Sequence, residues 1–261
     1  LHNGDHAYIL QNEDQRIVFV IPYNEYFSVV GTTDKEYKGD PAKVAMDDEE
    51  ESYLLDIVNK HFKRQLSSAD IVWRYSGVRP LCDDESDSPS AITRDYTLEV
   101  QAGEDQLAPI LSVFGGKITT YRKLAESALH ALKPWFKEMG ASWTAKEALP
   151  GGDITVDFEA WLIQLSREYP WVPAGMLRRM ANAYGTRITE ILGRASQLSD
   201  LGQQVGADLY ESEVKYMVTQ EWARSADDIL WRRSKLGLFV GADGRIILEQ
   251  LLSAKLQGWT A

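Results

Sequence analysis

The sequence predicts an α+β protein in two parts, a sheet-containing segment over residues 1–150 and an all-α segment over residues 151–261. Two observations predict this division. Short runs rich in β-branched and aromatic residues alternate with polar turn segments in the first part. After the stretch LPGGD at residues 149–153 such runs vanish, and apolar residues recur at helical spacing instead. A chain of 261 residues is long enough to bury a core in each part.

Composition excludes several classes of partner and site. The net charge of −11 opposes binding to nucleic acid, because phosphates would be repelled. It also disfavours docking on anionic lipid, although a local basic or apolar patch can still do so. Cys82 is the only cysteine, which excludes an intrachain disulfide and a cysteine-based metal cluster and fits a reducing cytoplasm. No apolar run approaches the length of a membrane span.

The first strands are predicted as a β-meander over residues 7–33. Runs at 7–10, 16–21 and 27–33 are separated by the polar segments NEDQ and YNEY. The middle run, RIVFVI, is nearly continuously apolar, which is typical of a central strand covered on both faces. Gly31 is interpreted as a β-bulge, with close approach of a ligand as the alternative.

A helix is predicted over Asp47–Leu66, because Asp47 and Glu50 have capping-box character and basic residues lie near its end. A strand is predicted at 70–75, leading into SGVRP. Arg79 precedes Pro80 in that motif, so its backbone is restrained. A restrained guanidinium suits recognition of an anion. The alternative is a surface arginine paired with the acids of residues 83–87.

Two further segments precede the main motif. The acidic stretch DDESDSPS at 83–90 lacks the ligand spacing of a calcium loop and is interpreted as solvated. Residues 91–100 alternate as a strand that contains Arg94, a second candidate anion contact, with a structural Arg–Asp pair as the alternative. A polar hairpin is predicted at 101–107.

The central motif is LSVFGGKITTYRK at residues 111–123, which predicts a strand, a double glycine and a helix from Thr120. Gly115 and Gly116 allow a ligand oxygen to approach backbone N–H groups near the positive end of the helix, and Lys117 adds a full charge there. Taken alone, the two glycines are more typical of a simple tight turn.

The remaining chain is predicted to be helical, with no internal repeat and no catalytic constellation. The predicted helices are 158–168, 176–184, 187–192, 212–223, 226–236 and 246–256.

The string GGKITTYRKLA resembles the C-terminal signature of the FAD-dependent glycerol-3-phosphate dehydrogenases, flavoproteins of the amino-acid-oxidase-like fold. The resemblance extends to AYILQNEDQRIVFVIPY, GTTD, YSGVRPLCDDESDSPSAITRDY and EVKYMVTQEWARSADDILWRRSKLGL. The chain starts at Leu1 and contains no G-x-G-x-x-G fingerprint after a strand. We therefore expect it to be the C-terminal half of a longer enzyme, whose N-terminal half is its first partner.

The resemblance implies that the intact enzyme oxidises sn-glycerol 3-phosphate to dihydroxyacetone phosphate, passing a hydride to FAD and electrons to a membrane quinone. It implies a cytoplasmic protein, with peripheral contact to the inner face of the cell membrane and a homodimer as further expectations. The catalytic base is expected upstream of this chain, so the chain alone is expected to be inactive and to bind FAD weakly.

The resemblance also gives roles to individual residues. Arg79 and Lys117 are the catalytic and substrate-binding candidates, and Arg94 and Thr120 are lesser substrate-binding candidates. The flavin-binding candidates are Gly115, Gly116, Lys117, Ile118 and Thr119. Two other functions stay open: a sister FAD-dependent oxidase of an amine or hydroxy acid, and a docking module in the helical segment 153–261.

Overall fold

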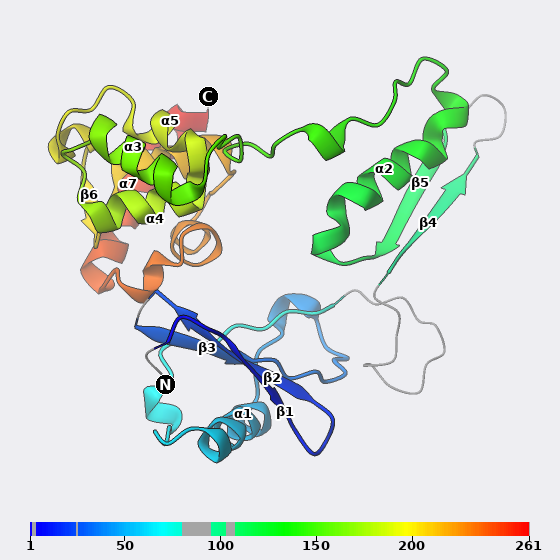
Figure 1. The fold of residues 1–261 in the computed structure, drawn as a ribbon, viewed down its shortest axis with the longest axis horizontal. Coiled ribbons are helices and arrows are strands. Elements are labelled where there is room, and N and C mark those ends of the chain that lie inside the picture. Colours follow the sequence, from blue (N-terminus) through cyan, green and yellow to red (C-terminus); the bar gives the residue numbers. More distant parts are fainter. Residues whose placement is uncertain (2–3, 25, 80–94, 103–107, 261) are drawn as a thin grey trace. The chain divides into compact units, whose positions relative to one another are not determined.

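The computed structural model describes the chain except for residues 2–3, 25, 80–94, 103–107 and 261. It divides into two compact units, Leu1–Ala145 and Lys146–Ala261 (Figure 1). The boundary predicted between residues 150 and 151 falls just inside the second unit. Cys82 and Arg94, with the acidic stretch at 83–90, lie outside the described residues.

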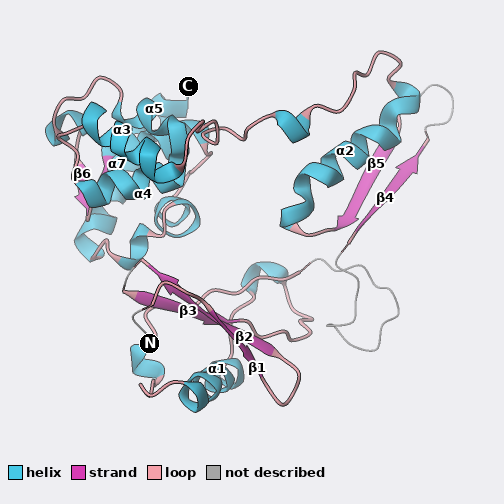
Figure 2. Ribbon diagram, viewed as in Figure 1, coloured by secondary structure: helices cyan, strands magenta, loops and turns pink. Residues whose placement is uncertain are grey.

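The first unit begins with the predicted meander, an antiparallel sheet in the order β1-β2-β3 (Figure 2). Its strands are β1 (Tyr8–Gln11), β2 (Ile17–Tyr23) and β3 (Phe27–Gly31). Gly31 pairs in register with Phe19. The interpretation of Gly31 as a bulge is therefore wrong, because a bulge would shift this register.

The helix α1 (Asp48–His61) packs on one face of this sheet. Asp47 and Glu50 form the predicted capping box: the Glu50 N–H donates to the Asp47 carboxylate at 2.9 Å, and the Asp47 N–H donates to Glu50 at 3.2 Å. The helix stops before the predicted end at Leu66. The Asn59 side chain bonds both the N–H and the carbonyl of Leu66, at 2.7 and 2.9 Å, and so holds the chain after the helix in a non-helical path.

The two faces of β2 differ sharply in burial. Val18 and Val20 are fully buried beside Val58 of α1. On the opposite face Phe19 and Ile21 are 38% and 42% exposed. The prediction that this strand is covered on both faces is therefore confirmed for the α1 face only, because the side chains of the opposite face are partly exposed among the described residues.

Residues 71–79 form no strand, so the prediction of a strand at 70–75 is wrong. A 3₁₀ turn (η2, Ser68–Asp70) precedes an extended segment that pairs with no neighbouring strand among the described residues. A strand needs a ladder of backbone hydrogen bonds from a partner, and side chains fix this segment instead. The Arg74 Nε donates to Glu51 of α1 at 2.7 Å, and the Trp73 and Tyr75 rings stack at 5.0 Å.

The hairpin of β4 (Tyr96–Gln101) and β5 (Ile110–Gly115) is followed by α2 (Tyr121–Leu132), as predicted. The hydroxyls of Tyr96 and Ser127 lie 3.0 Å apart and join β4 to α2. None of the described residues from 96 to 143 is fully buried. Short 3₁₀ turns complete the unit: η1 (Pro41–Lys43), η3 (Ile118–Thr120), η4 (Lys133–Trp135) and η5 (Thr144–Lys146).

The second unit is mostly helical and has two buried apolar clusters, one around α3, α4 and α5 and one around α6 and α7. The α-helices are α3 (Phe158–Glu168), α4 (Ala174–Tyr184), α5 (Ile188–Leu192), α6 (Glu211–Gln220) and α7 (Ala242–Thr260). A π-helix (η8, Asp228–Arg233) and the 3₁₀ turns η6 (Gly185–Arg187), η7 (Leu198–Leu201) and η9 (Leu236–Leu238) connect them.

The prediction of an all-α segment is wrong at one place. β6 (Gln204–Gly206) and β7 (Leu209–Tyr210) form a small antiparallel hairpin. Val205 and Leu209 are buried, and Ala207 takes a positive φ of 47° in the turn between them. Runs this short carry too few residues to show the alternation that marks a strand.

A charged network lies inside the second unit. Glu213 is 1% exposed and accepts hydrogen bonds from two Arg179 nitrogens at 2.7 and 2.8 Å. The Tyr184 hydroxyl donates to Glu213 at 2.7 Å, and Arg179 Nε donates to Asp208 at 3.0 Å. Burial raises the pKa of Tyr184 well above its usual value, and the Glu213 charge adds to this effect. Sequence reasoning missed Glu213, because apolar periodicity does not report a charge that is paired with a residue of another helix.

The LPGGD segment is tied to the second unit by close backbone contact. The Thr186 N–H donates to the Gly151 carbonyl at 3.1 Å, and both Gly151 and Gly185 have positive φ, 84° and 54°. A Cβ on Gly185 would overlap the Gly151 carbonyl oxygen. This stretch is therefore part of the helical fold rather than a free linker.

We expect Gly185→Ala to lower the free energy of unfolding by about 2–4 kcal/mol, because backbone strain and the overlap with Gly151 act together. Urea unfolding followed by circular dichroism measures the loss. Gly193→Ala is the matched control, since Gly193 has a similar φ of 55° but no atom within 4 Å of the added Cβ. An equal loss in both variants would mean that the contact with Gly151 contributes nothing.

Candidate functional site

The candidate site is the turn between β5 and α2. Gly115 and Gly116 have φ of 68° and 99°, a region that only glycine adopts without strain. A Cβ on Gly116 would lie 3.2 Å from Tyr96 Cβ and 3.3 Å from Leu124 Cδ1. The second glycine thus lets the turn pass close between the hairpin and the helix.

Beyond the glycines the chain turns into the helix through η3. Lys117 is extended, with φ of −85° and ψ of 140°. The Thr120 N–H and Oγ1 both donate to the Lys117 carbonyl, at 3.0 and 2.8 Å. Thr120, predicted as a substrate contact, therefore uses its hydroxyl proton inside the turn. Its oxygen can still accept a hydrogen bond.

The turn presents backbone donors to solvent. Lys117, Ile118 and Thr119 are exposed, and Ile118 is 87% exposed. Within the described part of the chain, the N–H groups of these three residues donate to no backbone carbonyl. Thr120, at the start of α2, makes no side-chain capping bond. Unpaired N–H groups beside a helix start attract a ligand that carries acceptor oxygens or negative charge.

Lys117 is held only loosely. Its Nζ lies 3.7 Å from the Asp95 carboxylate, and both side chains are exposed. Exposed ion pairs contribute little stability, so the ammonium group can leave Asp95 for an incoming anion at small cost.

Arg79 lies on the extended segment before residue 80. Its NH1 donates to the Asp34 carboxylate at 2.9 Å, and its side chain is 42% exposed. Asp34 ends the GTTD motif, so this contact joins two of the motifs that carry the family resemblance. The acids at 83–87, the alternative partners, lie outside the described residues.

The two principal cations each contact a different carboxylate. Arg79 pairs with Asp34, and Lys117 pairs with Asp95. The five flavin-binding candidates lie together in one turn by their adjacency in sequence. Their joint role with Arg79 stays a prediction.

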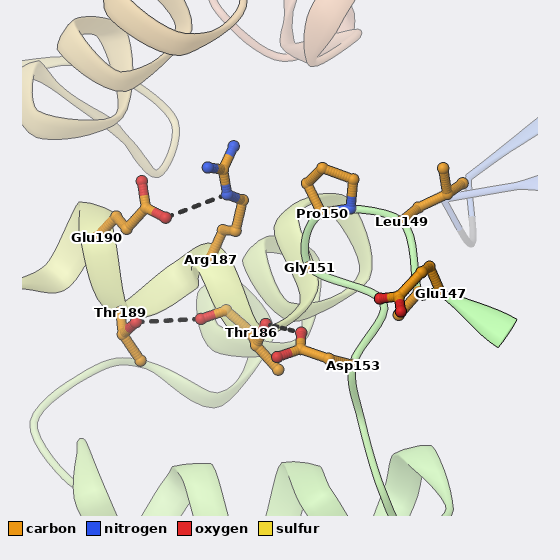
Figure 3. Close-up of a pocket in the computed structure, with 10 residues that line it drawn as sticks. Glu147, Leu149, Pro150, Gly151, Asp153, Thr186, Arg187, Thr189 and Glu190 are labelled. Carbon is orange, nitrogen blue, oxygen red and sulfur yellow. Dashed lines mark hydrogen bonds and ion pairs between the residues drawn. The ribbon is translucent and has the colours of Figure 1, made fainter. Parts of the chain in front are cut away.

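An open pocket of about 580 Å³ lies in the second unit, between the LPGGD segment and the start of α5 (Figure 3). Asp153, Arg187 and Glu190 each make a hydrogen bond or ion pair within the pocket. The Thr186 hydroxyl donates to Asp153, which lowers the pKa of that carboxyl group, and Arg187 Nε lies 3.1 Å from Glu190. Sequence reasoning treated this stretch only as a domain boundary. The paired groups form no catalytic arrangement.

The described residues contain no candidate metal site and no candidate membrane span. No three His, Cys, Asp or Glu side chains in that part of the chain lie close enough to hold a metal ion. None of its helices has both the length and the apolar character required to cross a bilayer.

Two family profiles match the chain. Residues 2–122 match the profile described as FAD dependent oxidoreductase, and residues 142–260 match the C-terminal domain of alpha-glycerophosphate oxidase. The turn at 115–120 lies within the first match.

Curated relatives agree with these profiles. The chain is 56% identical over 255 residues to a glycerol-3-phosphate dehydrogenase of Pseudomonas aeruginosa, covering 98% of this chain and 50% of the relative. It is 54% identical over 252 residues to the aerobic glycerol-3-phosphate dehydrogenase of Escherichia coli, covering 97% and 50%. It is 44% identical over 234 residues to a D-erythritol 1-phosphate dehydrogenase of Brucella abortus, covering 89% and 46%. The chain spans about half the length of these relatives.

Proposed function

The chain belongs to the FAD-dependent glycerol-3-phosphate dehydrogenase family, and we propose that its β5–α2 turn binds the flavin of such an enzyme. The proposed reaction is the oxidation of sn-glycerol 3-phosphate to dihydroxyacetone phosphate. The observation that carries the proposal is the turn itself, where two positive-φ glycines, three N–H groups that donate to no described backbone carbonyl, and Lys117 lie inside the segment matched as FAD dependent oxidoreductase.

The donor set of the turn fits a flavin. FAD supplies the acceptor for the hydride that leaves C2 of the substrate. The N–H groups of Lys117, Ile118 and Thr119 would stabilise negative charge at the pyrimidine edge of the flavin ring, because fixed donors need no reorganisation when charge develops. Glycine at positions 115 and 116 leaves room for that edge.

The substrate carries a phosphate dianion, which requires cations. We assign this role to Arg79 and Lys117, with Arg94 and Thr120 as additional contacts. Arg79 offers a fork of donors matched to phosphate oxygens, and its bond to Asp34 would orient that fork. Lys117 supplies a mobile charge next to the flavin-binding turn.

The proton of the substrate 2-hydroxyl needs a base, and we propose that the half of the relatives that this chain does not match supplies it. Among the described histidines, His61 places its Nδ1 2.8 Å from the Ile57 carbonyl within α1, which is a structural role. We therefore propose that the chain alone binds FAD weakly and does not turn over. Quinone as electron acceptor, peripheral contact with the inner face of the cell membrane, and a homodimer complete the proposal for the intact enzyme.

The B. abortus relative favours a second candidate substrate. Its name describes a dehydrogenase of the phosphate ester of a polyol that is one carbon longer than glycerol. This chain is 44% identical to that relative. The class supported by both names is a polyol phosphate. The phosphate-binding cations would serve either member of this class.

The test is flavin reduction in a chimera, in which this chain replaces the matched half of the P. aeruginosa relative. We expect the purified chimera to hold FAD and its absorbance to bleach on addition of glycerol 3-phosphate without acceptor. D-erythritol 1-phosphate is the competing substrate and glycerol the control without phosphate. Bleaching by glycerol as fast as by glycerol 3-phosphate would overturn the phosphate assignment. Bound FAD that no polyol phosphate bleaches would favour a sister oxidase.

A further inference from the structure

Tyr96, the first residue of β4, contacts both elements that the flavin-binding turn connects. In the ladder it pairs with Gly115, the last residue of β5. A Cβ on Gly116 would lie 3.2 Å from Tyr96 Cβ and 3.8 Å from its Cδ1, so the Tyr96 side chain packs against the glycine backbone. At its far end, the Tyr96 hydroxyl lies 3.0 Å from Ser127 Oγ of α2. One side chain therefore extends from the turn to the helix.

The packing of α2 against the hairpin is shallow. None of its described side chains is fully buried, and its start at Thr120 has no side-chain cap. A helix of 12 residues is marginally stable by itself, so contacts with the hairpin decide where its first turn lies. Leu124 and Ser127 are three residues apart and so share the face that meets the hairpin. The hydrogen bond of Ser127 is directional and fixes the rotation of that face, which apolar contact alone does not.

We propose that Tyr96 and Ser127 are positioning residues for the flavin, an inference that rests on the proposed function of the turn. The N–H groups of residues 117–119 immediately precede α2, so a rotation of the helix would redirect them. Donors stabilise developing charge best when they are fixed before the charge appears. Asp95, the residue before Tyr96, lies 3.7 Å from Lys117. Two consecutive residues thus contact the backbone and the cation of the same turn.

The simpler alternative is a bond between Tyr96 and Ser127 that only stabilises the fold. Loss of such a bond would lower the urea midpoint and the amount of FAD bound, but the flavin that stays bound would keep its reduction potential. Loss of a positioning pair changes that potential, because the donors stabilise the negative charge of the reduced flavin more than the oxidised ring.

The first test is the reduction potential of FAD in the chimera, measured by titration against a reference dye. Tyr96→Phe and Ser127→Ala each remove one hydroxyl of the pair, and Tyr96→Phe keeps the ring beside Gly116. We expect each variant to disfavour the reduced flavin about tenfold, a fall of about 30 mV for a two-electron couple. The double variant should fall no further, because the two hydroxyls act as one bond. Ser112→Ala is the matched control, since Ser112 is a half-buried serine of β5 whose hydroxyl bonds no described residue.

The second test needs no flavin and uses this chain alone. Hydrogen–deuterium exchange followed by mass spectrometry reports the opening of α2. We expect Tyr96→Phe and Ser127→Ala to speed exchange of the amides of α2 about fivefold, the effect of losing one hydrogen bond, and to leave β1, β2 and β3 unchanged. Ser112→Ala should leave exchange of α2 unchanged.

The outcomes separate this inference from the proposed function. Unchanged potentials in variants whose chimera still bleaches would overturn the positioning role and leave the proposed function intact. Unchanged exchange of α2 in the chain would also overturn it, because the pair would then not hold the helix. Failure of the unsubstituted chimera to hold FAD would overturn the proposed function and this inference with it.

Discussion

Arg179→Ala is expected to lower the free energy of unfolding by about 3–5 kcal/mol, the range found when one partner of a buried ion pair is removed. The reason is the environment of Glu213, which is 1% exposed. Without Arg179 its carboxylate would keep the Tyr184 hydroxyl as a partner but lose both charged donors. Urea unfolding of the full chain, followed by tryptophan fluorescence, measures the change.

The neighbouring Arg178 provides a matched control for this prediction. It makes two hydrogen bonds to Glu159, at 2.6 and 2.7 Å, but both side chains are at least half exposed. Arg178→Ala should therefore leave stability nearly unchanged. Losses of similar size in the two variants would show that burial of Glu213 is not the cause.

Arg79→Ala in the chimera is expected to slow flavin reduction by glycerol 3-phosphate about 10- to 10²-fold, the effect of removing one hydrogen-bonded charge from the substrate phosphate. Lys117→Ala should impair it as well. Stopped-flow bleaching at several substrate concentrations separates weaker binding from slower hydride transfer. Arg74→Ala is the control, since Arg74 also pairs with one carboxylate, that of Glu51, and lies outside the proposed site.

Asp34→Asn separates catalysis from a purely structural role of Arg79. If Arg79 serves only to hold Asp34, at 2.9 Å, then Arg79→Ala and Asp34→Asn should slow flavin reduction equally. We expect Asp34→Asn to keep most of the activity, because the guanidinium stays available to the phosphate. Bleaching that survives both Arg79→Ala and Lys117→Ala would leave the family membership intact and remove these two residues from the site.

Local signals predicted much of the fold. The Asp47–Glu50 capping box placed the start of α1, and the glycines at 115 and 116 placed the turn between β5 and α2. Helices α3 to α7 follow their apolar periodicity. These features depend on residues within a few positions of one another, and a single sequence contains that information.

The predictions that failed depend on partners distant in sequence. Residues 70–75 have the composition of a strand but find no neighbouring strand in the described part of the chain. Burial of the second face of β2, where Phe19 and Ile21 are partly exposed among the described residues, likewise depends on residues far away in sequence. Glu213 was missed because its burial depends on Arg179, on another helix, and periodicity does not report such pairs.

The hairpin and α2, which carry the flavin-binding turn, contain no fully buried side chain among their described residues. Ordering a backbone costs about 1–2 kcal/mol per residue, and burial normally offsets that cost. In the hairpin and α2, binding of a ligand or partner would supply the stabilisation that burial provides elsewhere. A dissociation constant for flavin measured on this chain would therefore combine contact energy with the free energy of ordering the turn, and it would understate how well the turn and the flavin fit each other.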